Sequence, residues 1–270
     1  MKISTLHRTI ANRVKVAARF SRALGSSFAG QLLLFTRVIT LPKNGTKPRA
    51  ISCFHRGRRF TAHLFSFREL KPFLEVFAAG DYAGDWQNCR TIVDVGANIG
   101  AASLFFWLHA PAARIIAIEP NQANLERLKL NLAQIPGALI IQKALAGESG
   151  RVSFFRADGF SLGSTLVEKR PGYIEDSVEA MTLDDLLQSL DIESVDLCKF
   201  DIEGAEFELF SRFADTGRLR QFIGEFHEDL AHKPVADFLQ LFPGHSTEAV
   251  EIAPQRFICR GVACRKEVMA

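Results

Sequence analysis

Glycines, an acid and an amide lie close together in residues 94–100, which read D-V-G-A-N-I-G. An apolar, strand-like stretch precedes this run and a helix-like stretch follows it. In open α/β sheets, ligands bind beyond the carboxyl ends of the strands, so the run would lie where a nucleotide-like ligand binds. Gly96 and Gly100 would let the backbone approach that ligand closely, and Asp94 could accept a hydrogen bond from an ammonium group or a water.

A second acid, Glu119, ends the next predicted strand and is followed by Pro120. A carboxylate there can accept two hydrogen bonds from the hydroxyls of a ribose. A dinucleotide site would need G-x-G-x-x-G to hold a pyrophosphate, whereas residues 96–100 read G-x-N-x-G. S-adenosylmethionine has no phosphate, so the turn favours this cofactor. A NAD-dependent dehydrogenase and a non-catalytic nucleotide-binding module remain as alternatives.

Residues 196–206 read D-L-C-K-F-D-I-E-G-A-E, an apolar strand that ends in charged residues. Alternation along the strand puts Lys199 and Asp201 on one face, with Asp201 at the carboxyl edge beside the first turn. We expect Glu203 and Glu206 in the first turn of the next helix, where the helix dipole favours acids. A purely structural Lys199–Asp201 ion pair with helix-start acids would produce the same pattern.

Residues 224–229, G-E-F-H-E-D, end another predicted strand and put Glu225 and His227 on one face. Histidine is a natural general base near neutral pH, so we hypothesise that His227 takes the proton of an acceptor alcohol, oriented by Glu225 or Asp201. Lys199 would pair with Asp201 or stabilise a developing alkoxide. The alternative is a capping histidine with surface acids. No ligand spacing calls for a metal ion, so we expect none, although several of these side chains are of ligand type.

Strand and helix patterns alternate from residue 91 onward. This alternation predicts an α/β fold with a mostly parallel sheet, helices on both faces and an antiparallel C-terminal hairpin. The predicted strands are 91–95, 113–119, 139–145, 151–155, 195–200 and 221–226, the predicted helices are 101–108, 122–134, 183–189 and 203–213, and the hairpin comprises 248–252 and 256–263.

The first 68 residues differ from the rest of the chain in charge. They hold fourteen lysines and arginines and no acid, which leaves 19 basic residues (33 minus 14) and 30 acidic residues in 69–270. Apolar residues at helical spacing predict a basic amphipathic helix over 3–24. A hairpin is expected over 51–66 and a helix over 69–79. The amphipathic helix could pack on its own domain or on the mate in a homodimer, or it could lie on an anionic membrane surface.

The composition narrows the class of protein further. With 47% hydrophobic residues in 270, the chain can bury a sizeable core. Five scattered cysteines form no C-x-x-C pair, which indicates buried thiols in a reducing compartment. We find no transmembrane helix or secretory signal and expect a cytoplasmic protein, with peripheral contact to a membrane as the alternative location. The basic leader lacks a stacking pattern or recognition motif, so we expect no nucleic-acid partner.

Taken together and in order, these stretches resemble the FkbM family of methyltransferases. The resemblance covers residues 70–230 and includes E-P at 119–120, A-L-A at 144–146, T-L-D-D-L at 182–186 and E-x-H at 225–227. It implies a class I methyltransferase-like, Rossmann-like fold with a seven-stranded sheet over 69–270, in which 89–230 form the cofactor-binding core. Residues 1–68 match the family poorly and form a basic N-terminal extension.

The resemblance implies S-adenosylmethionine as the cofactor and O-methylation of a hydroxyl on a small molecule, a sugar or a glycolipid. Asp201 would lie near the methionine amine of the cofactor or near the acceptor. We expect the acceptor pocket to form from the leader, residues 156–180 and the tail, with 160–165 as a flexible lip. The residues expected around the cofactor are Asp94, Gly96, Ala97, Asn98, Gly100, Glu119, Pro120, Ala144 and Asp201.

Overall fold

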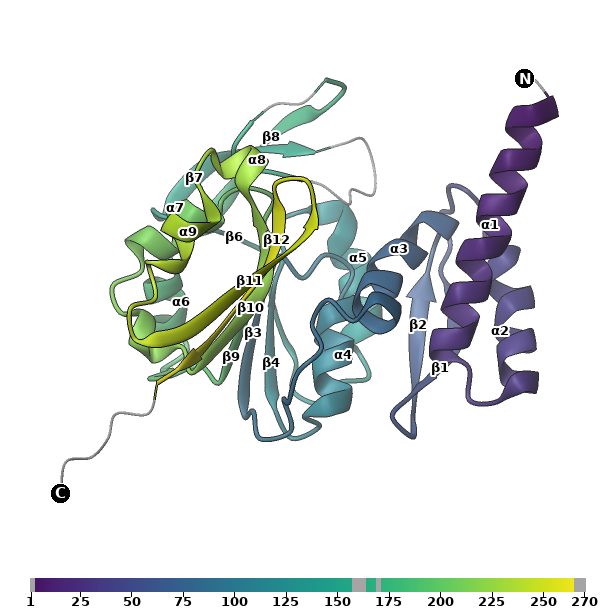
Figure 1. Ribbon diagram of the computed structural model, residues 1–270, viewed down its shortest axis with the longest axis horizontal. Helices are drawn as coiled ribbons and strands as arrows, with labels where there is room; N and C mark the ends of the chain where they lie inside the picture. The colour runs from purple at the N-terminus through teal and green to yellow at the C-terminus, as the bar shows by residue number, and fades with distance from the viewer. Residues whose placement is uncertain (1–2, 157–163, 169–170, 265–270) are drawn as a thin grey trace.

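A seven-stranded sheet forms the centre of the computed structural model, which describes residues 3–156, 164–168 and 171–264 (Figure 1). In spatial order, its strands are β11 (His245–Ala253), β12 (Arg256–Ala263), β10 (Gln221–His227), β9 (Leu197–Phe200), β3 (Thr91–Val95), β4 (Arg114–Ile118) and β5 (Leu139–Ile141). The five strands from β10 to β5 run parallel, and the β11–β12 hairpin adds to β10 in the antiparallel direction. The mostly parallel sheet with an antiparallel C-terminal hairpin is therefore confirmed.

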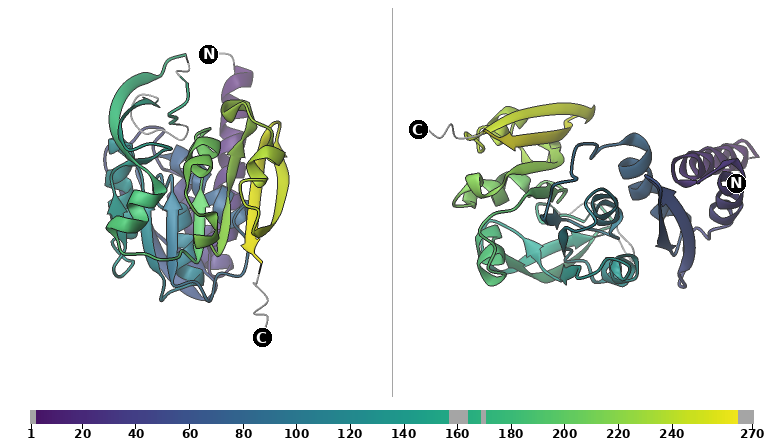
Figure 2. Two further views of the ribbon diagram at one scale, coloured as in Figure 1. Left: turned by 90° about the vertical axis from the view of Figure 1, so that its left-hand side faces the viewer. Right: turned by 90° about the horizontal axis from the view of Figure 1, so that it is seen from below.

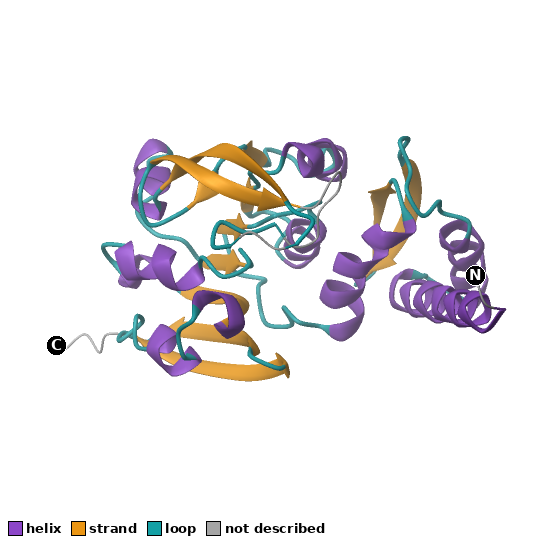
Figure 3. Ribbon diagram, turned by 90° about the horizontal axis from the view of Figure 1, so that it is seen from above, coloured by secondary structure: helices purple, strands orange, loops and turns teal. Residues whose placement is uncertain are grey.

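Helices cover both faces of this sheet (Figures 1 and 3). Side chains alternate along each strand, so Ile92 of β3 joins one core while Val93 and Val95 join the other. The first core includes α4 (Ala101–His109) and α5 (Gln122–Leu132). The helices of the second core are α6 (Leu183–Ser189), α7 (Glu206–Arg212) and α9 (Val235–Leu239), and the short α8 (Glu228–Ala231) follows β10.

A separate three-stranded sheet corrects the prediction of one strand over 139–145. The chain leaves the main sheet at the polar residues Gln142 and Lys143, and β6 (Ala144–Leu145) then pairs with β8 (Ile174–Met181). The antiparallel neighbour of β8 is β7 (Gly150–Arg156), close to the predicted strand. We did not predict β8, because it is largely exposed and half of its sequence, I-E-D-S-V-E-A-M, is polar or charged.

The N-terminal extension consists of two helices and a hairpin, at the opposite end of the molecule from β11–β12 (Figures 1 and 2). The predicted amphipathic helix is α1 (Ile3–Leu24), and the hairpin is β1 (Arg49–His55) with β2 (Arg58–Leu64). The sequence analysis missed α2 (Phe28–Ile39), because the serines and glycines of 25–30 indicated a break. Ser27 instead caps this helix by accepting a hydrogen bond from the Gly30 amide.

The extension does not have a core of its own. Buried Ala17, Phe20 and Leu24 of α1 belong to the same apolar cluster as Phe73 and Phe106, so the amphipathic helix packs on its own chain. The predicted helix over 69–79 is a continuous run of η1 (Phe67–Glu69), α3 (Leu70–Leu74) and η2 (Glu75–Ala79), which lies between the extension and α4.

Two side-chain amides, one in the last turn of α5 and one just after it, hold the free edge of β2. The amide N–H of His63 donates to Asn131 Oδ1 (2.7 Å), and that of Thr61 donates to Gln134 Oε1 (2.9 Å). Gln134 Nε2 returns a hydrogen bond to the Thr61 carbonyl (2.7 Å). Within the described ranges, no helix is both long enough and apolar enough to cross a membrane.

Candidate active site

Two adjoining cavities lie where the parallel strands end. The first, called here the Glu119 cavity, is lined by Glu119, Pro120 and Ala144 together with Leu145 and Phe154. The second, called here the acidic cleft, has a volume of about 310 Å³. The two cavities share Gly96, Asn98, Asp201 and Glu203 in their walls, so one ligand could reach from the first into the second.

Glu119 is held at the end of β4 by hydrogen bonds to both of its oxygens. Oε2 accepts from the Asn98 amide (2.8 Å), and Oε1 accepts from the Asn121 amide (2.9 Å) and from Asn124 Nδ2 (3.3 Å). Burial outweighs these hydrogen bonds and raises the pKa of Glu119 to about 7. Because each carboxylate oxygen has two lone pairs, Glu119 can still accept from a ligand hydroxyl.

The turn at 96–100 has the glycines that the sequence indicated, but they serve close packing of the chain itself. Gly96 has φ 74°, and a Cβ there would lie 2.0 Å from the Asp201 carbonyl oxygen. Gly100 has φ 87°, and its Cβ would meet Leu132 of α5 at 2.4 Å. Gly96 lines both cavities, whereas Gly100 lies behind them.

Asn98 and Ala97 complete the part of the turn that faces the cavities. Asn98 adopts φ 51°, a left-handed conformation that asparagine tolerates better than most residues. Its buried Oδ1 has no hydrogen-bond partner in the part of the chain that the structure describes, although Asn98 lines both cavities. Ala97 lines the acidic cleft. The turn therefore offers a free acceptor to a ligand that lies across it.

Asp94 and Lys199 form a buried ion pair behind the turn, with 3.0 Å between Oδ1 and Nζ. Asp94 also accepts from Ser103 Oγ (2.6 Å), and Lys199 donates to the carbonyls of Val95 (3.3 Å) and Gly96 (2.9 Å). A pair between Lys199 and Asp201 was one of the alternatives that the sequence left open, but the observed partner is Asp94. This pair fixes the turn from behind.

The acidic cleft is walled by the C-terminal tail, which we had expected at the acceptor pocket, and by a segment that we had not expected there. Tyr82 and Lys71 come from the lead-in to β3, and Arg256 comes from the C-terminal hairpin. We had expected the leader to contribute, but within the described residues no part of 1–68 lines this cleft. The predicted lip over 160–165 lies largely outside the described residues; Ser164, which is described, lines the Glu119 cavity.

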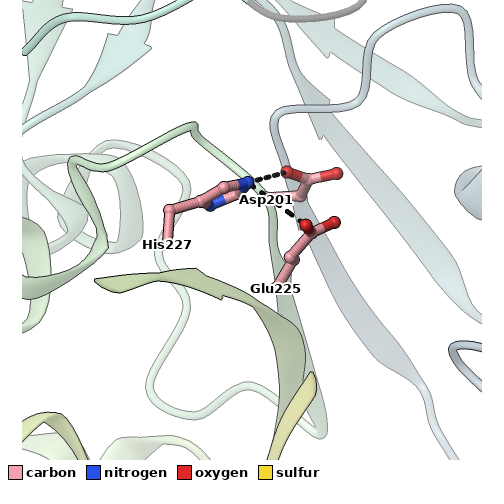
Figure 4. A group of neighbouring side chains, drawn as sticks. All are labelled: Asp201, Glu225 and His227. Carbon is pink, nitrogen blue, oxygen red and sulfur yellow. Dashed lines mark ion pairs between the residues drawn. The ribbon is translucent and has the colours of Figure 1, made fainter. Parts of the chain in front are cut away.

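His227 lies behind the carboxylates of the cleft wall, with Asp201 and Glu225 on one side of its ring (Figure 4). Its ring is fully buried, and Nδ1–H donates to Glu206 Oε1 at 2.9 Å. On the other side of the ring, Nε2 lies 3.4 Å from Glu225 Oε1, 3.8 Å from Glu203 Oε2 and 4.0 Å from Asp201 Oδ1. The sequence analysis correctly grouped these side chains, because the carboxyl ends of β9 and β10 are neighbours.

Charge governs protonation in this cluster. Burial disfavours the imidazolium, but the negative charges of Glu206, Glu225 and Asp201 outweigh it and raise the pKa of His227 to about 11. Burial and the charge of Glu225 raise the pKa of Asp201 to about 7. Despite its burial, Glu225 has a lowered pKa because of His227 and Arg256. His227 is thus charged at neutral pH, and Asp201 can exchange a proton there.

Glu206 is the residue of this cluster whose role the sequence analysis missed. We expected a helix-start acid, and α7 does begin at Glu206, but its carboxylate is fully buried and accepts from the amides of Ile202 and Gly204 as well as from His227. The prediction that Glu203 belongs to the helix is wrong. Glu203 has φ 53° in the preceding turn, a strained conformation of the kind that is found at functional sites.

Comparisons with known proteins point to one family. The family model described as "Methyltransferase FkbM domain" matches residues 94–241. The chain is 30% identical to Methyltransferase sdnD of Sordaria araneosa over 51% of its own length and 66% of that protein, just under two thirds. It is 24% identical to 2-O-methyltransferase NoeI of Sinorhizobium fredii, over 56% of this chain and 70% of NoeI.

Two further proteins are similar to this chain. Hexuronic acid methyltransferase AglP of Haloferax volcanii is 27% identical over 54% of this chain and 59% of AglP. The crystal structure of Methyltransferase FkbM from Methylobacillus flagellatus is 13% identical, with a TM-score of 0.46 over 94% of this chain and 60% of that chain. The family match includes the turn at 94–100, Glu119 and the whole carboxylate–histidine cluster.

Proposed function

Because this chain belongs to the FkbM methyltransferase family, we propose that it transfers a methyl group from S-adenosylmethionine to a hydroxyl oxygen of a sugar or another small molecule. One observation carries the proposal: the Glu119 cavity opens into an acidic cleft, and Asp201 lies in the wall of both. A cofactor in the first cavity could therefore present its methyl group to an acceptor in the second.

The residues of the Glu119 cavity fit this cofactor. Glu119 would accept from the ribose hydroxyls, and the unpartnered Asn98 Oδ1 would accept from the amino-acid end. Ala144 and Leu145 give an apolar wall for the adenine, beside Phe154. When bound, S-adenosylmethionine supplies an activated methyl group on a positively charged sulfur. The Asp94–Lys199 pair would keep the turn in shape without contact to the cofactor.

The acidic cleft would bind the acceptor and take up its proton as the oxygen–carbon bond forms. The sequence analysis proposed His227 for this step. Its ring is fully buried, however, and its pKa of about 11 leaves it protonated at neutral pH. Asp201 and Glu203 reach the cleft themselves. We therefore assign the proton to one of these carboxylates, with Glu225 and Arg256 as further contacts for acceptor hydroxyls.

Relatives supply the substrate class of the proposal. NoeI is named a 2-O-methyltransferase and AglP a hexuronic acid methyltransferase. A cleft lined by Lys71, Tyr82, Asp201, Glu225 and Arg256 offers the mixture of donors and acceptors that a polyhydroxylated acceptor needs. The dehydrogenase and the non-catalytic module are the competing functions.

Two measurements test the proposal. Calorimetric titration with S-adenosylhomocysteine should show binding at one site, whereas NAD should show none; the reverse result would favour the dehydrogenase, and no binding of either would favour the non-catalytic module. Incubation with methyl-labelled cofactor and extract of the source cell should then label a hydroxylated small molecule. Label that appears on nitrogen or carbon would refute O-methylation and leave methyl transfer intact.

A further inference from the structure

Asp201, Glu225 and His227 direct their polar atoms toward one another (Figure 4), and the two carboxylates also line the acidic cleft. One atom from each of Asp201, Glu225 and His227 can be chosen so that all three lie within 4.8 Å of one another. A cation with ligand bonds of about 2.1 Å would hold adjacent donors about 3.0–3.4 Å apart and opposite donors about 4.2 Å apart. The 3.4 Å from His227 Nε2 to Glu225 Oε1 suits adjacent donors, and the 4.0 Å from Nε2 to Asp201 Oδ1 lies between the adjacent and the opposite spacing.

The orientation of His227 is the independent observation. Glu206 accepts from Nδ1–H at 2.9 Å and is itself fully buried, so the other ring nitrogen points toward Asp201 and Glu225. Nε2 is buried and makes no hydrogen bond of good geometry to any described residue. A carboxylate that orients a histidine in this way is a recurrent arrangement behind metal ligands, because it fixes the tautomer and makes the free nitrogen more basic.

The negative charge of the cluster also favours a bound cation. Four carboxylates lie within 4.0 Å of the ring nitrogens of one histidine; Glu206 is fully buried, and the side chains of Glu203 and Glu225 are only 15% and 19% exposed. Arg256 reaches Glu225 only at 3.6 Å. A proton on His227 supplies one positive charge to this group, whereas a divalent cation supplies two. Negative charge that is removed from water in this way requires a partner.

We propose that Asp201, Glu225 and His227 bind a divalent cation of the first transition series. One nitrogen and two carboxylate donors suit Mn²⁺, Fe²⁺ or Zn²⁺ better than Mg²⁺, which prefers oxygen alone. The spacing in the sequence had called for no metal, because the donors come from two different strands. The cation would replace the proton on Nε2.

The role of this cation rests on the proposed function. Located at the wall of the acidic cleft, it would bind the acceptor oxygen and ease the loss of its proton. Asp201 would then act as a ligand, which leaves Glu203 as the carboxylate that takes the proton. Cation binding itself needs neither acceptor nor cofactor, so it can be tested alone.

The test is a titration of Mn²⁺ into the chelator-treated full chain, followed by the paramagnetic resonance signal of free Mn²⁺. We expect one site, which is weakened at least about tenfold in Asp201→Asn and in His227→Gln. Glu75→Gln is the matched control, because Glu75 is an acid of the same cleft that pairs with Lys71 and lies outside the cluster. Its Mn²⁺ affinity should equal that of the native chain.

Circular dichroism and the melting temperature serve as the folding check for each variant, because Asp201 also lines the Glu119 cavity. The proposal is overturned if the native chain binds no Mn²⁺, if the two ligand variants bind it as the native chain does, or if Glu75→Gln loses it equally. A chain that binds S-adenosylhomocysteine but no Mn²⁺ would leave the proposed function intact. A chain that binds Mn²⁺ at this site but transfers no methyl group would support the cation site and refute the proposed function.

A second, independent observation concerns the outer face of α2. Phe28, Leu32 and Leu33 are 84%, 59% and 60% exposed, which is far more than large apolar side chains usually are. At about 100° per residue these three lie on one side of the helix, opposite the buried Leu34 and Val38. The chain itself therefore leaves an apolar strip of α2 uncovered.

The two helices of the extension also carry exposed positive charge. Lys15, Arg19 and Arg22 on α1 and Arg37 on α2 are exposed, and the first 68 residues contain no acid. A second copy of the chain would bring the same positive charge against itself. An anionic bilayer offers both an apolar interior for the strip and negative headgroups for the lysines and arginines.

We infer that the extension binds an anionic membrane surface with the outer face of α2 inserted. In co-sedimentation, the full chain should bind vesicles of phosphatidylcholine with phosphatidylserine, and much less those of phosphatidylcholine alone. Binding should fall as salt rises. The triple variant Phe28→Ser, Leu32→Ser, Leu33→Ser should lose it, whereas Val250→Ser with Val262→Ser, which alters exposed apolar residues at the other end of the molecule, should not.

Equal binding to both kinds of vesicle, or no effect of the triple variant, would overturn this inference. So would a dimer in analytical ultracentrifugation that the triple variant abolishes, because the strip would then be an interface between copies. Because the three altered side chains are exposed, the variant should fold, which its affinity for S-adenosylhomocysteine can verify.

Discussion

The carboxyl edge of the sheet and the N-terminal extension hold charge in opposite ways. At the edge, Lys199 is buried against Asp94 and His227 against Glu206, so each of these two side chains has a specific partner. In the extension, Lys15 and Arg19 are exposed, and the first acid of the chain comes after it. A buried charge depends on the identity of its partner, whereas exposed charges act through their sum. Single substitutions should therefore matter far more at the edge.

The largest effect should follow from Asp201→Asn. The substitution keeps the shape of the side chain and removes a carboxylate that can hold a proton or a cation, so kcat should fall about 100-fold or more. Asp229→Asn is the matched control: Asp229 lies at the same edge and pairs with Arg256, but it lines neither cavity. Steady-state kinetics with the acceptor found by labelling would measure both. Equal losses of kcat in the two variants would show that charge at this edge acts through its sum and not through particular residues.

Alanine substitution at one glycine of each region should lower the free energy of unfolding by different amounts. Gly96 at the edge and Gly57 in the hairpin of the extension have nearly the same φ, 74° and 75°. A methyl group at Gly57 meets nothing within 4 Å, so Gly57→Ala should cost only the left-handed strain of about 1–2 kcal/mol. Gly96→Ala adds a clash with the Asp201 carbonyl oxygen, which overpacking values put at about 1–3 kcal/mol more. Urea unfolding would measure both losses of stability. Equal losses would mean that the backbone around Gly96 relaxes and removes the clash.

Cofactor affinity should depend on Glu119 and on pH. Hydrogen bonds to a charged group contribute about 1.5–3 kcal/mol, so Glu119→Gln should weaken S-adenosylhomocysteine about 10- to 100-fold. The ionised form accepts from the ribose hydroxyls, and the pKa is about 7. Native affinity should thus fall as pH drops through 7, while the variant should show a weaker dependence. Calorimetry across pH would detect this, with the exposed Glu148→Gln as control.

The smallest effect should come from one charge of the extension. Lys15→Ala should reduce partitioning to anionic vesicles by about fivefold at most, because one lysine near a membrane contributes about 1 kcal/mol. Arg19→Ala should do the same, and the two losses should add. If either residue alone abolished binding, the extension would have a specific partner site, and the comparison with the edge would fail.

Local patterns predicted the elements that position the site. The bounds of β3 and α6 agree with the sequence analysis, because glycines follow one and Thr182 caps the other. Their positions at the ends of neighbouring strands also predicted that Asp201, Glu225 and His227 lie close together.

The partners within the site could not be predicted in the same way. Glu206 lies 21 residues before His227, and an acid at a helix start needs no further explanation than the helix dipole. Likewise, Lys199 could pair with an acid of its own strand or of the neighbouring one, and only the register of β3 against β9 decides for Asp94. The sequence pattern predicts which face of a strand a side chain lies on, whereas the packing of the elements determines its partner.

The side-chain amides of Asn131 and Gln134 should protect this chain from aggregation when it is produced in the cell. A two-stranded hairpin exposes an unpaired edge to which strands of other chains could add, and such edges promote aggregation. The two amides satisfy the outward groups of Thr61 and His63 as a third strand would. Truncation or redesign of α5 near its end would uncover this edge, so insoluble expression would be the first sign of damage there, even with the carboxyl edge intact.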